Sequence, residues 1–405
     1  DATRGGMAAA GAGGDGGAAK PAAADSARVE AAAAWRPSAR SMLGCLLVVR
    51  AVGARLAPVM DCDEAFNYLE PVHYLLRGSG MQTWEYSPAY ALRSYAFVEL
   101  YAIPVRLALD VFGLDKVRAF FVLRAALGAL CAACEAAFCD AAARRLGPRV
   151  GLLAFCFSAS ASGMFHAAVA TLPSTACMYA VLLGFAAWLR GRPGLGLWCG
   201  AFAVLLGMPV AAPLFVPMGV DALRPGVLGP CKVAAIAAQA LVAFAALPSV
   251  LDGWYYGTQR PVWAMGNHLL YNVAGVGGGG AGADLYGTEP WTFYAKNLLL
   301  NFNAVALLAA PSALAPVMRL ALQRLAPSRA GAANAAGSAL HPLALLLVVL
   351  LPMYATLGVF FAMAHKEERF LTMVYPLICL AAAITADFCL GALEAVVGAI
   401  SRRCG

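Results

Sequence analysis

The chain has 405 residues, of which 61% are hydrophobic and only 13% are charged, with a formal net charge of +7. Soluble globular proteins carry about 25% charged residues, so this composition excludes an ordinary water-soluble protein and predicts a chain that lies mainly in a lipid bilayer. The 12 cysteines lie mostly in apolar runs, without the spacing of a zinc site or a disulfide framework.

The N-terminal segment 1–40 is rich in Ala and Gly and has no periodic apolar face, so it is predicted to be a disordered leader. The chain begins at Asp1, and Met7 is a candidate initiator. The segment lacks the basic, apolar and small-residue layout of a cleavable signal. The first apolar run is therefore expected to be an uncleaved membrane anchor.

Long apolar runs follow along most of the chain. A membrane-spanning helix needs about 20 such residues, and the runs close to that length are 41–59, 117–143, 149–166, 171–189, 232–251, 293–318, 340–363 and 370–395. They predict an all-α, multi-pass integral membrane protein whose transmembrane domain covers residues 41–398. Residues 399–405 are expected to form a cytosolic tail that is truncated.

Two further apolar runs are interrupted. Residues 195–220 contain Pro209 and Pro213, which break the ladder of backbone hydrogen bonds, so this run is either one kinked span or a hairpin of two short limbs. Residues 95–113 contain charged side chains and a proline. This pattern favours an amphipathic helix that lies on the membrane surface.

Basic residues gather in short loops between the predicted spans. Because Lys and Arg favour the cytosolic side of a membrane, these loops are expected to share that side: 144–149, 190–192, 224–232, 319–329 and 402–403. The arrangement requires a hairpin at 195–220 and places three polar segments in the lumen, 61–116, 252–292 and 364–369. The glycine-rich run 276–284 has no phosphate-binding loop pattern and is interpreted as a flexible connector.

The third luminal segment contains the charged stretch HKEERF (365–370) between two apolar runs. It runs against the positive-inside trend, and charges kept at such a position favour a functional role. Two interpretations stay open: these side chains pair with one another at the membrane interface, or they bind a ligand.

The first luminal segment opens with DCDEAFNYLEPVHYLL and combines carboxylates with aromatic rings, which suit sugar faces or an interfacial belt. A carboxylate at the membrane edge can act as a general base that takes a proton from an attacking hydroxyl. The spacing of Asp61 and Asp63 also fits a metal-binding pair. Cations of HKEERF on the same side can balance a lipid monophosphate leaving group, so a base without a metal is the simpler account.

Long motifs carry a family resemblance. In chain order, the segments DCDEAFNYLEPVHYLLRGSGMQTWEYSPAYALRSYAF, DGWYYG, YNV, DLYGTEPWTFYAKNLLLNFN and HKEERFLTMVYPLICL resemble glycosyltransferase family 22, over about residues 36–395. Within that family, QTWEYSPAYALRSYA is most similar to the alpha-1,2-mannosyltransferases of N-glycan lipid-linked oligosaccharide assembly.

The resemblance implies a GT-C fold with a long first luminal loop, in the endoplasmic reticulum membrane. It implies inverting transfer of mannose from dolichyl-phosphate mannose, in alpha-1,2 linkage, to lipid-linked Man6GlcNAc2 and Man8GlcNAc2 for protein N-glycosylation. The partners are then these lipid-linked substrates and the bilayer, with no nucleic acid, and neither a cofactor nor a metal is expected. The alternatives are an alpha-1,6-mannosyltransferase or GPI-anchor mannosyltransferase of the same family and, from another class, a lipid or solute transporter.

Residue roles follow from the matched motifs. Asp63 is the expected general base, with Glu64 as the second catalytic candidate, and the expected donor phosphate-binding residues are His365, Lys366 and Arg369. The expected substrate contacts are Asp61, Glu70, Trp84, Glu85, Tyr86, Arg93, Tyr286, Glu289, Trp291, Glu367 and Glu368. Further luminal candidates, each more often structural than catalytic, are Asp252, Tyr255, Arg260 and His268.

Overall fold

The computed structural model describes residues 37–274, 287–325 and 340–404. Nearly all of the predicted leader, the whole glycine-rich run 276–284 and the candidate Tyr286 lie outside these residues. Throughout the described ranges the regular secondary structure is helical, which confirms the all-α prediction.

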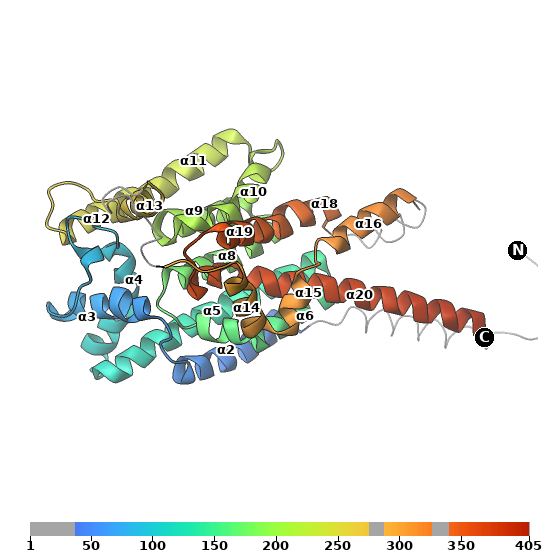
Figure 1. Cartoon of the computed structure of the whole chain (residues 1–405), viewed down its shortest axis with the longest axis horizontal. Coiled ribbons are helices and arrows are strands. Elements are labelled where there is room, and N and C mark those ends of the chain that lie inside the picture. The colour runs from blue at the N-terminus through green and yellow to red at the C-terminus, as the bar shows by residue number, and fades with distance from the viewer. Residues whose placement is uncertain (1–36, 275–286, 326–339, 405) are drawn as a thin grey trace, which may run out of the picture. The chain divides into compact units, whose positions relative to one another are not determined.

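The helices follow one another with short connections, and several are joined end to end by single π or 3-10 turns. In chain order they are α2 (Ala39–Leu56), α3 (Glu70–Arg77), α4 (Tyr95–Arg106), α5 (Lys116–Leu146), α6 (Pro148–Ser160), α7 (Ser162–Ala167), α8 (Pro173–Leu189), α9 (Pro193–Phe202), α10 (Ala212–Leu223), α11 (Pro230–Leu241), α12 (Leu247–Tyr255), α13 (Ala264–Ala274), α14 (Thr292–Phe302), α15 (Ala304–Ala309), α16 (Leu314–Leu325), α18 (Pro342–Ala344), α19 (Leu351–Ala362) and α20 (Tyr375–Cys404) (Figure 1). Three short turns matter for the site: η1 (Glu64–Leu69), η2 (Trp84–Tyr86) and η9 (Glu368–Val374).

Among the described residues, five helical stretches are long and apolar enough to cross a membrane: Lys116–Leu146, Pro230–Tyr255, Ala304–Ala321, Pro342–Ala362 and Glu368–Ser401. Shorter apolar helices cover Pro173–Leu189, Pro193–Gly207 and Pro209–Leu223. The predicted first span forms helix α2, but α2 carries three arginines, Arg40, Arg50 and Arg55, and is not among the five. The chain is therefore a helical membrane protein, as its composition predicts.

Two predicted spans are interrupted in the structure. Run 149–166 divides at Ala161 into α6 and α7, because the backbone of Ala161 is extended rather than helical. Run 293–318 divides at Asn303, whose φ of 50° is not helical and separates α14 from α15. Apolar composition predicts that a segment enters the bilayer, and it carries no signal for such local breaks.

The run 195–220 forms a hairpin, which settles the alternative that the sequence leaves open. A Cβ added to Gly196 would lie 2.5 Å from the Met218 sulfur, and one added to Gly200 would lie 2.8 Å from the Phe215 ring. The earlier residue of α9 thus meets the later residue of α10, so the two helices are antiparallel. Gly196 and Gly200 form a G-x-x-x-G pair, which permits close helix approach in membranes.

The segment 95–113 is helical over α4, as predicted, and continues as a π-turn over Leu107–Val111. Ser94 caps its start, since the Ser94 hydroxyl accepts from the Phe97 N–H at 3.2 Å. The Asp252 carboxylate of α12 accepts from the Ala96 N–H at 2.8 Å and ties α4 to that helix. One face of α4 is buried, whereas Leu100 and Ile103 are exposed. The location of α4 at the membrane surface stays a prediction.

The loops predicted to be cytosolic come together at several points. The Leu340 N–H donates to the Arg145 carbonyl at 3.1 Å, and Arg149 and Arg319 both pair with Asp387 of α20, at 3.8 and 3.2 Å. These contacts bring together two of the basic regions, 144–149 and 319–329. They agree with a shared side for those loops.

Gly151 of α6 provides a test of the packing between α5 and α6. A Cβ added there would lie 2.3 Å from the Ala143 Cβ and 2.6 Å from its Cα, so Gly151→Ala forces the two helices apart. We expect a loss of about 1–3 kcal/mol in unfolding free energy. Thermal unfolding in detergent micelles measures it. Gly44→Ala in α2 is the control, because no atom lies within 4 Å of its added Cβ; equal melting of the two variants would contradict the packing.

Candidate active site

The site begins where the chain leaves α2. Arg124 of α5 is buried and donates to the last carbonyls of that helix, from Nε to Ala54 at 3.1 Å and from Nη2 to Ala57 at 2.6 Å. These bonds satisfy carbonyls that a helix end leaves unpaired. They also fix the point from which the chain continues toward Asp63.

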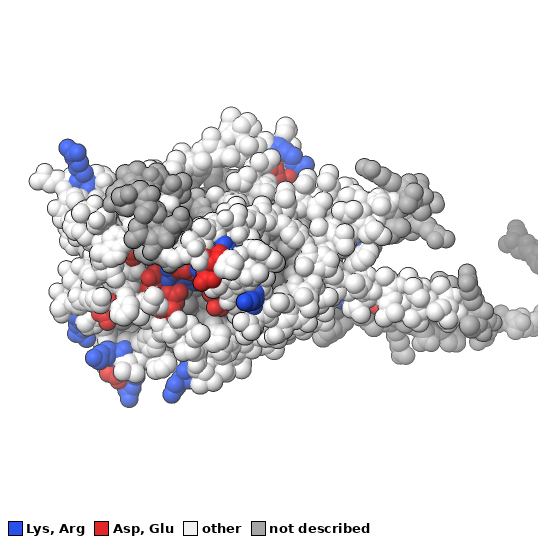
Figure 2. Space-filling view, viewed as in Figure 1, with Lys and Arg blue, Asp and Glu red and all other residues white. Residues whose placement is uncertain are grey.

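Asp63 lies just beyond this point, between two guanidinium groups. Arg93 Nη2 is 3.0 Å from Asp63 Oδ2, and Arg369 Nη1 is 2.8 Å from the same oxygen. Arg369 Nη1 is also 2.6 Å from Asp61 Oδ1, and its guanidinium forms an ion pair with Glu367. In Figure 2 acidic and basic side chains gather in one place on the visible face, and other charged side chains lie toward its edges. The acids after α2 and the HKEERF stretch therefore form one cluster.

A series of hydrogen bonds positions the Arg93 side chain. Arg93 Nε and Nη2 each lie 3.0 Å from an oxygen of Glu85, which is a bidentate pair, and Arg93 Nη1 donates to the Tyr68 hydroxyl at 2.7 Å. Glu85 accepts in turn from the Asn67 side chain at 2.6 Å. Asn67 itself accepts from the Thr83 hydroxyl at 2.6 Å. Each group of the series is oriented by the next, so the Arg93 guanidinium has one position.

Glu64 points away from this cluster although it follows Asp63 directly. It is 3% exposed, and its Oε1 accepts from the Thr171 N–H at 2.9 Å and from the Thr171 hydroxyl at 3.3 Å. Burial raises the pKa of the Glu64 carboxyl, and the hydrogen bonds from Thr171 oppose that shift. Glu64 therefore ties the first loop to the segment before α8.

The HKEERF residues divide into two groups. Lys366 is 6% exposed and donates to the carbonyl oxygens of Glu289, at 2.9 Å, and of Met363. His365 contacts the Glu367 carboxylate through Nε2, at 2.8 Å, and the Gly287 carbonyl through Nδ1, at 3.0 Å. Lys366 thus holds the backbone of the loop, whereas His365, Glu367 and Arg369 belong to the charged cluster.

The remaining predicted contacts are more scattered. Glu70 accepts from the Met81 N–H at 3.4 Å, and Glu368 accepts from the Asn301 side chain at 2.8 Å. Tyr86 is buried, with its hydroxyl on the Asn67 carbonyl, whereas Trp84 and Trp291 are exposed. Among the further candidates, Asp252 caps α4, the Tyr255 hydroxyl donates to Glu99, Arg260 is exposed, and His268 is half-buried.

Sequence reasoning missed two hydrogen-bonding partners, Thr83 and Thr171. The Thr83 hydroxyl donates to the Asn67 side chain, and the Thr171 N–H donates to the Glu64 carboxylate. These partners lie 16 and 107 residues away along the chain. No local pattern marks them, because a single hydroxyl in a loop has no periodicity.

Three neighbouring side chains could hold a metal ion. Asp61, Cys62 and Asp63 each bring one ligand atom within 4.8 Å of the others. Both aspartates also contact the Arg369 guanidinium, so a positive charge already lies between the two carboxylates.

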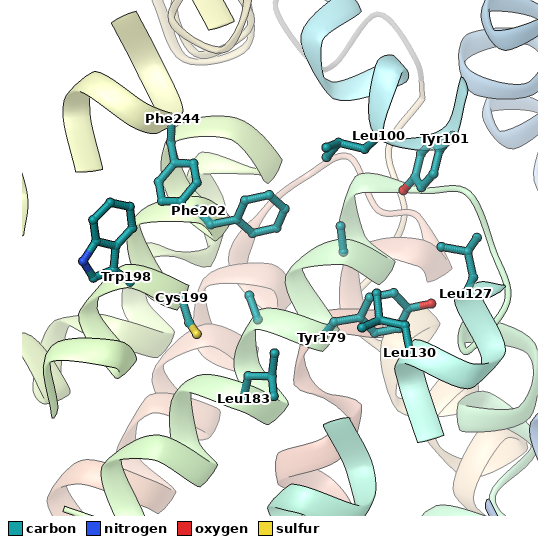
Figure 3. A pocket seen from close by; sticks show the side chains of 12 residues that line it. Leu100, Tyr101, Leu127, Leu130, Tyr179, Leu183, Trp198, Cys199, Phe202 and Phe244 are labelled. Carbon is teal, nitrogen blue, oxygen red and sulfur yellow. The ribbon is translucent and has the colours of Figure 1, made fainter. Parts of the chain in front are cut away.

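A partly open apolar cavity of about 480 Å³ lies among the helices. Figure 3 shows aromatic and aliphatic side chains around it, among them Tyr101 of α4, Leu127 of α5, Tyr179 of α8 and Phe202 of α9. Tyr101 stacks edge-to-face on Phe97, and Phe97 on Tyr68, whose hydroxyl receives Arg93. A continuous row of rings thus leads from the cavity to the charged cluster.

Comparisons with known proteins match most of the chain. The sequence model of the Alg9-like mannosyltransferase family matches residues 41–395. The chain is 39% identical to the human alpha-1,2-mannosyltransferase ALG9 over 355 residues, which cover 86% of this chain and 54% of that protein. Its identity to the Caenorhabditis elegans alpha-1,2-mannosyltransferase algn-9 is 36%, over 87% of this chain and 56% of that protein. Its identity to Saccharomyces cerevisiae ALG9 is 33%, over 80% and 55%.

The chain thus spans about half the length of the curated relatives that it matches. No solved structure matches it.

Proposed function

The chain belongs to the Alg9-like mannosyltransferase family, and from that premise we propose that it transfers mannose in alpha-1,2 linkage from dolichyl-phosphate mannose to a lipid-linked oligosaccharide. The acceptors are Man6GlcNAc2 and Man8GlcNAc2, on the luminal side of the endoplasmic reticulum membrane. One observation carries the proposal: Asp63 lies between Arg93 and Arg369. A candidate general base and a candidate phosphate-binding cation are therefore neighbours in one cluster.

Asp63 is the general base of this proposal. Its Oδ2 receives both guanidinium groups, and its Oδ1 has no hydrogen-bond partner among the described residues. The fixed Oδ2 sets the plane of the carboxylate, and the free Oδ1 takes the proton from the acceptor hydroxyl as that oxygen attacks the anomeric carbon. Attack from the side opposite the phosphate inverts the configuration there.

Arg369 receives the leaving phosphate. The bond between the anomeric carbon and the phosphate oxygen breaks with its electrons on that oxygen, and a guanidinium nearby stabilises the growing negative charge. Arg369 reaches the cluster through the ion pair with Glu367 and the contact with Asp61. A phosphate oxygen can take the place of one of those carboxylates. Arg93 keeps its bidentate pair with Glu85 and positions Asp63.

Glu64 and Lys366 act as anchors in this scheme. Both are buried, and both hold backbone groups: Glu64 the N–H of Thr171, Lys366 the carbonyls of Glu289 and Met363. They keep the first loop and the HKEERF loop in place. Of Asp63 and Glu64, Asp63 is thus the base and Glu64 supports the first loop. Of Arg369 and Lys366, Arg369 binds the phosphate and Lys366 supports the HKEERF loop.

The apolar cavity favours a lipid-linked substrate for this enzyme. Its lining offers hydrocarbon and aromatic surface from four or more helices, which suits an isoprenoid chain. The row of rings from Tyr101 to Tyr68 would place the phosphate end of such a chain toward the charged cluster.

A transfer assay tests the function. The chain in lipid nanodiscs is expected to transfer mannose from dolichyl-phosphate mannose to Man6GlcNAc2 and Man8GlcNAc2 on dolichyl diphosphate, and an alpha-1,2-mannosidase is expected to remove the added sugar. Transfer is expected to continue in EDTA, because Arg369 supplies the charge at the phosphate.

Two results would count against this function. Mannose added only to other acceptors, or in alpha-1,6 linkage, would favour another member of the family. Loss of transfer in EDTA with recovery on adding Mn²⁺ or Mg²⁺ would assign Asp61 and Asp63 to a metal.

A further inference from the structure

Helix α13 packs against the first loop, close to Arg93. The Asn267 side chain donates to the Ala91 carbonyl at 3.1 Å, which attaches the helix to the first loop two residues before Arg93. One turn further along, Tyr271 packs against Trp84 and Tyr90, with ring centroids 5.7 and 6.4 Å apart. The contacts on both sides of His268 are therefore to the first loop.

The loop beneath α13 is strained at the point of attachment. Ala91 has a φ of 46°, a left-handed conformation that residues with a Cβ rarely adopt. Such strain persists only where the surroundings hold it. The Asn267 hydrogen bond is one of the contacts that hold it, so the position of α13 over the loop is well defined.

His268 lies between these contacts, in the neighbourhood of the charges of the site. Burial and the positive charges of Arg93 and Arg369 lower the pKa of His268 to about 3, against the opposing charge of Asp63. The imidazole is therefore neutral at any physiological pH. Its Nδ1 is buried and has no hydrogen-bond partner within the part of the chain that the structure describes.

The two ring nitrogens of His268 have different surroundings. Buried N–H groups without a partner are rarer than buried acceptors without one, so the enclosed Nδ1 carries the lone pair and the proton resides on Nε2. Nε2 has no hydrogen bond to any described residue, and unlike Nδ1 it is not enclosed by protein. The site thus holds an uncharged donor beside two guanidinium groups, all three of which suit phosphate oxygens.

We propose that His268 is a further donor-binding residue of this enzyme, and that its Nε2–H donates a hydrogen bond to a phosphate oxygen of the polyprenyl-phosphate sugar. The proposal rests on the function proposed above and extends its phosphate site beyond HKEERF, to a helix almost 100 residues earlier in the chain. A neutral donor adds a directed bond to the phosphate without adding charge to the cluster.

Binding of dolichyl phosphate to two variants of similar side-chain size tests this role. His268→Leu removes the donor, and His268→Gln keeps an N–H near the position of Nε2. A hydrogen bond to a charged group corresponds to a loss of about 10- to 100-fold in affinity. We expect His268→Leu to weaken the binding of dolichyl phosphate to the chain in nanodiscs by that factor, and His268→Gln to restore most of it. His73→Ala, at an exposed histidine of α3, is the control and should bind as the parent chain does.

Thermal unfolding separates binding from a structural role. His268→Leu removes a buried nitrogen that has no partner, so its melting temperature should equal or exceed that of the parent chain while its affinity falls. A structural histidine would show the opposite, a lower melting temperature in both variants with affinity unchanged in whatever remains folded.

Three results would overturn the proposal. They are unchanged dolichyl phosphate binding by His268→Leu, a loss in His268→Gln as large as in His268→Leu, and competition by methyl α-mannoside rather than by inorganic phosphate. A binding step that titrates near pH 6 and disappears in both variants would also contradict a neutral imidazole. Because these measurements involve no sugar transfer, failure of the mannosyl-transfer assay alone would leave this result standing.

Discussion

Asp63→Asn is expected to lower mannosyl transfer by about 10²–10⁴-fold, the usual contribution of a general base. The amide keeps the shape of the carboxylate, and its oxygen can still accept from the guanidinium groups of Arg93 and Arg369. It cannot take a proton from the acceptor hydroxyl. The measurement is the initial rate of transfer to Man6GlcNAc2 at saturating donor, together with the melting temperature of the variant.

Glu64→Gln is the matched control, because Glu64 is the adjacent acid and faces the other way. Its amide oxygen can accept from the Thr171 N–H as the carboxylate does. Burial already raises the pKa of Glu64 and so disfavours its charged form, which means that a neutral amide fits the same position. We expect Glu64→Gln to retain most of the activity. If instead Glu64→Gln abolishes transfer and Asp63→Asn does not, the roles of the two residues are reversed.

The membrane-embedded helices could be predicted from the sequence because lipid permits few backbone conformations for a long apolar run. A long apolar run must satisfy its own backbone hydrogen bonds, so it becomes a helix. That is why residues 117–143 and 340–363 were located to within a few residues as Lys116–Leu146 and Pro342–Ala362. The breaks at Ala161 and Asn303 depend on single backbone angles. Hydropathy does not record such angles.

Only part of the charged cluster could be predicted from the sequence. Motif resemblance gives Asp63, Arg93 and Arg369 as candidate site residues, and the structure brings all three together. The resemblance could not separate Lys366 from Arg369, which lie three residues apart on a short loop. Which of them reaches the cluster depends on the path of residues 287–289, to which Lys366 and His365 attach. That path is a matter of tertiary structure.

Arg50→Met is expected to destabilise the helix bundle by about 3–5 kcal/mol, because it leaves a buried carboxylate without its partner. Arg50 of α2 and Glu135 of α5 are both fully buried and form a bidentate pair at 2.6 and 2.8 Å. Arg50 also donates to the Ser158 carbonyl of α6 at 2.9 Å, and the Ser158 hydroxyl donates to Glu135. The pair therefore joins three helices away from the charged cluster. Denaturant or thermal unfolding in detergent micelles gives the loss.

The double variant Arg50→Met/Glu135→Leu separates the worth of the ion pair from the penalty of breaking it. Two charges taken out of water lose hydration that their mutual attraction only partly returns, so replacing both with apolar side chains is often neutral or stabilising. We therefore expect the double variant to recover most of the stability that Arg50→Met loses, with α2, α5 and α6 still packed. If the double variant is as unstable as the single one, the pair contributes net stability to the bundle. If Arg50→Met itself melts with the parent chain, Glu135 must take up a proton or reach another donor, and the three helices do not depend on this contact.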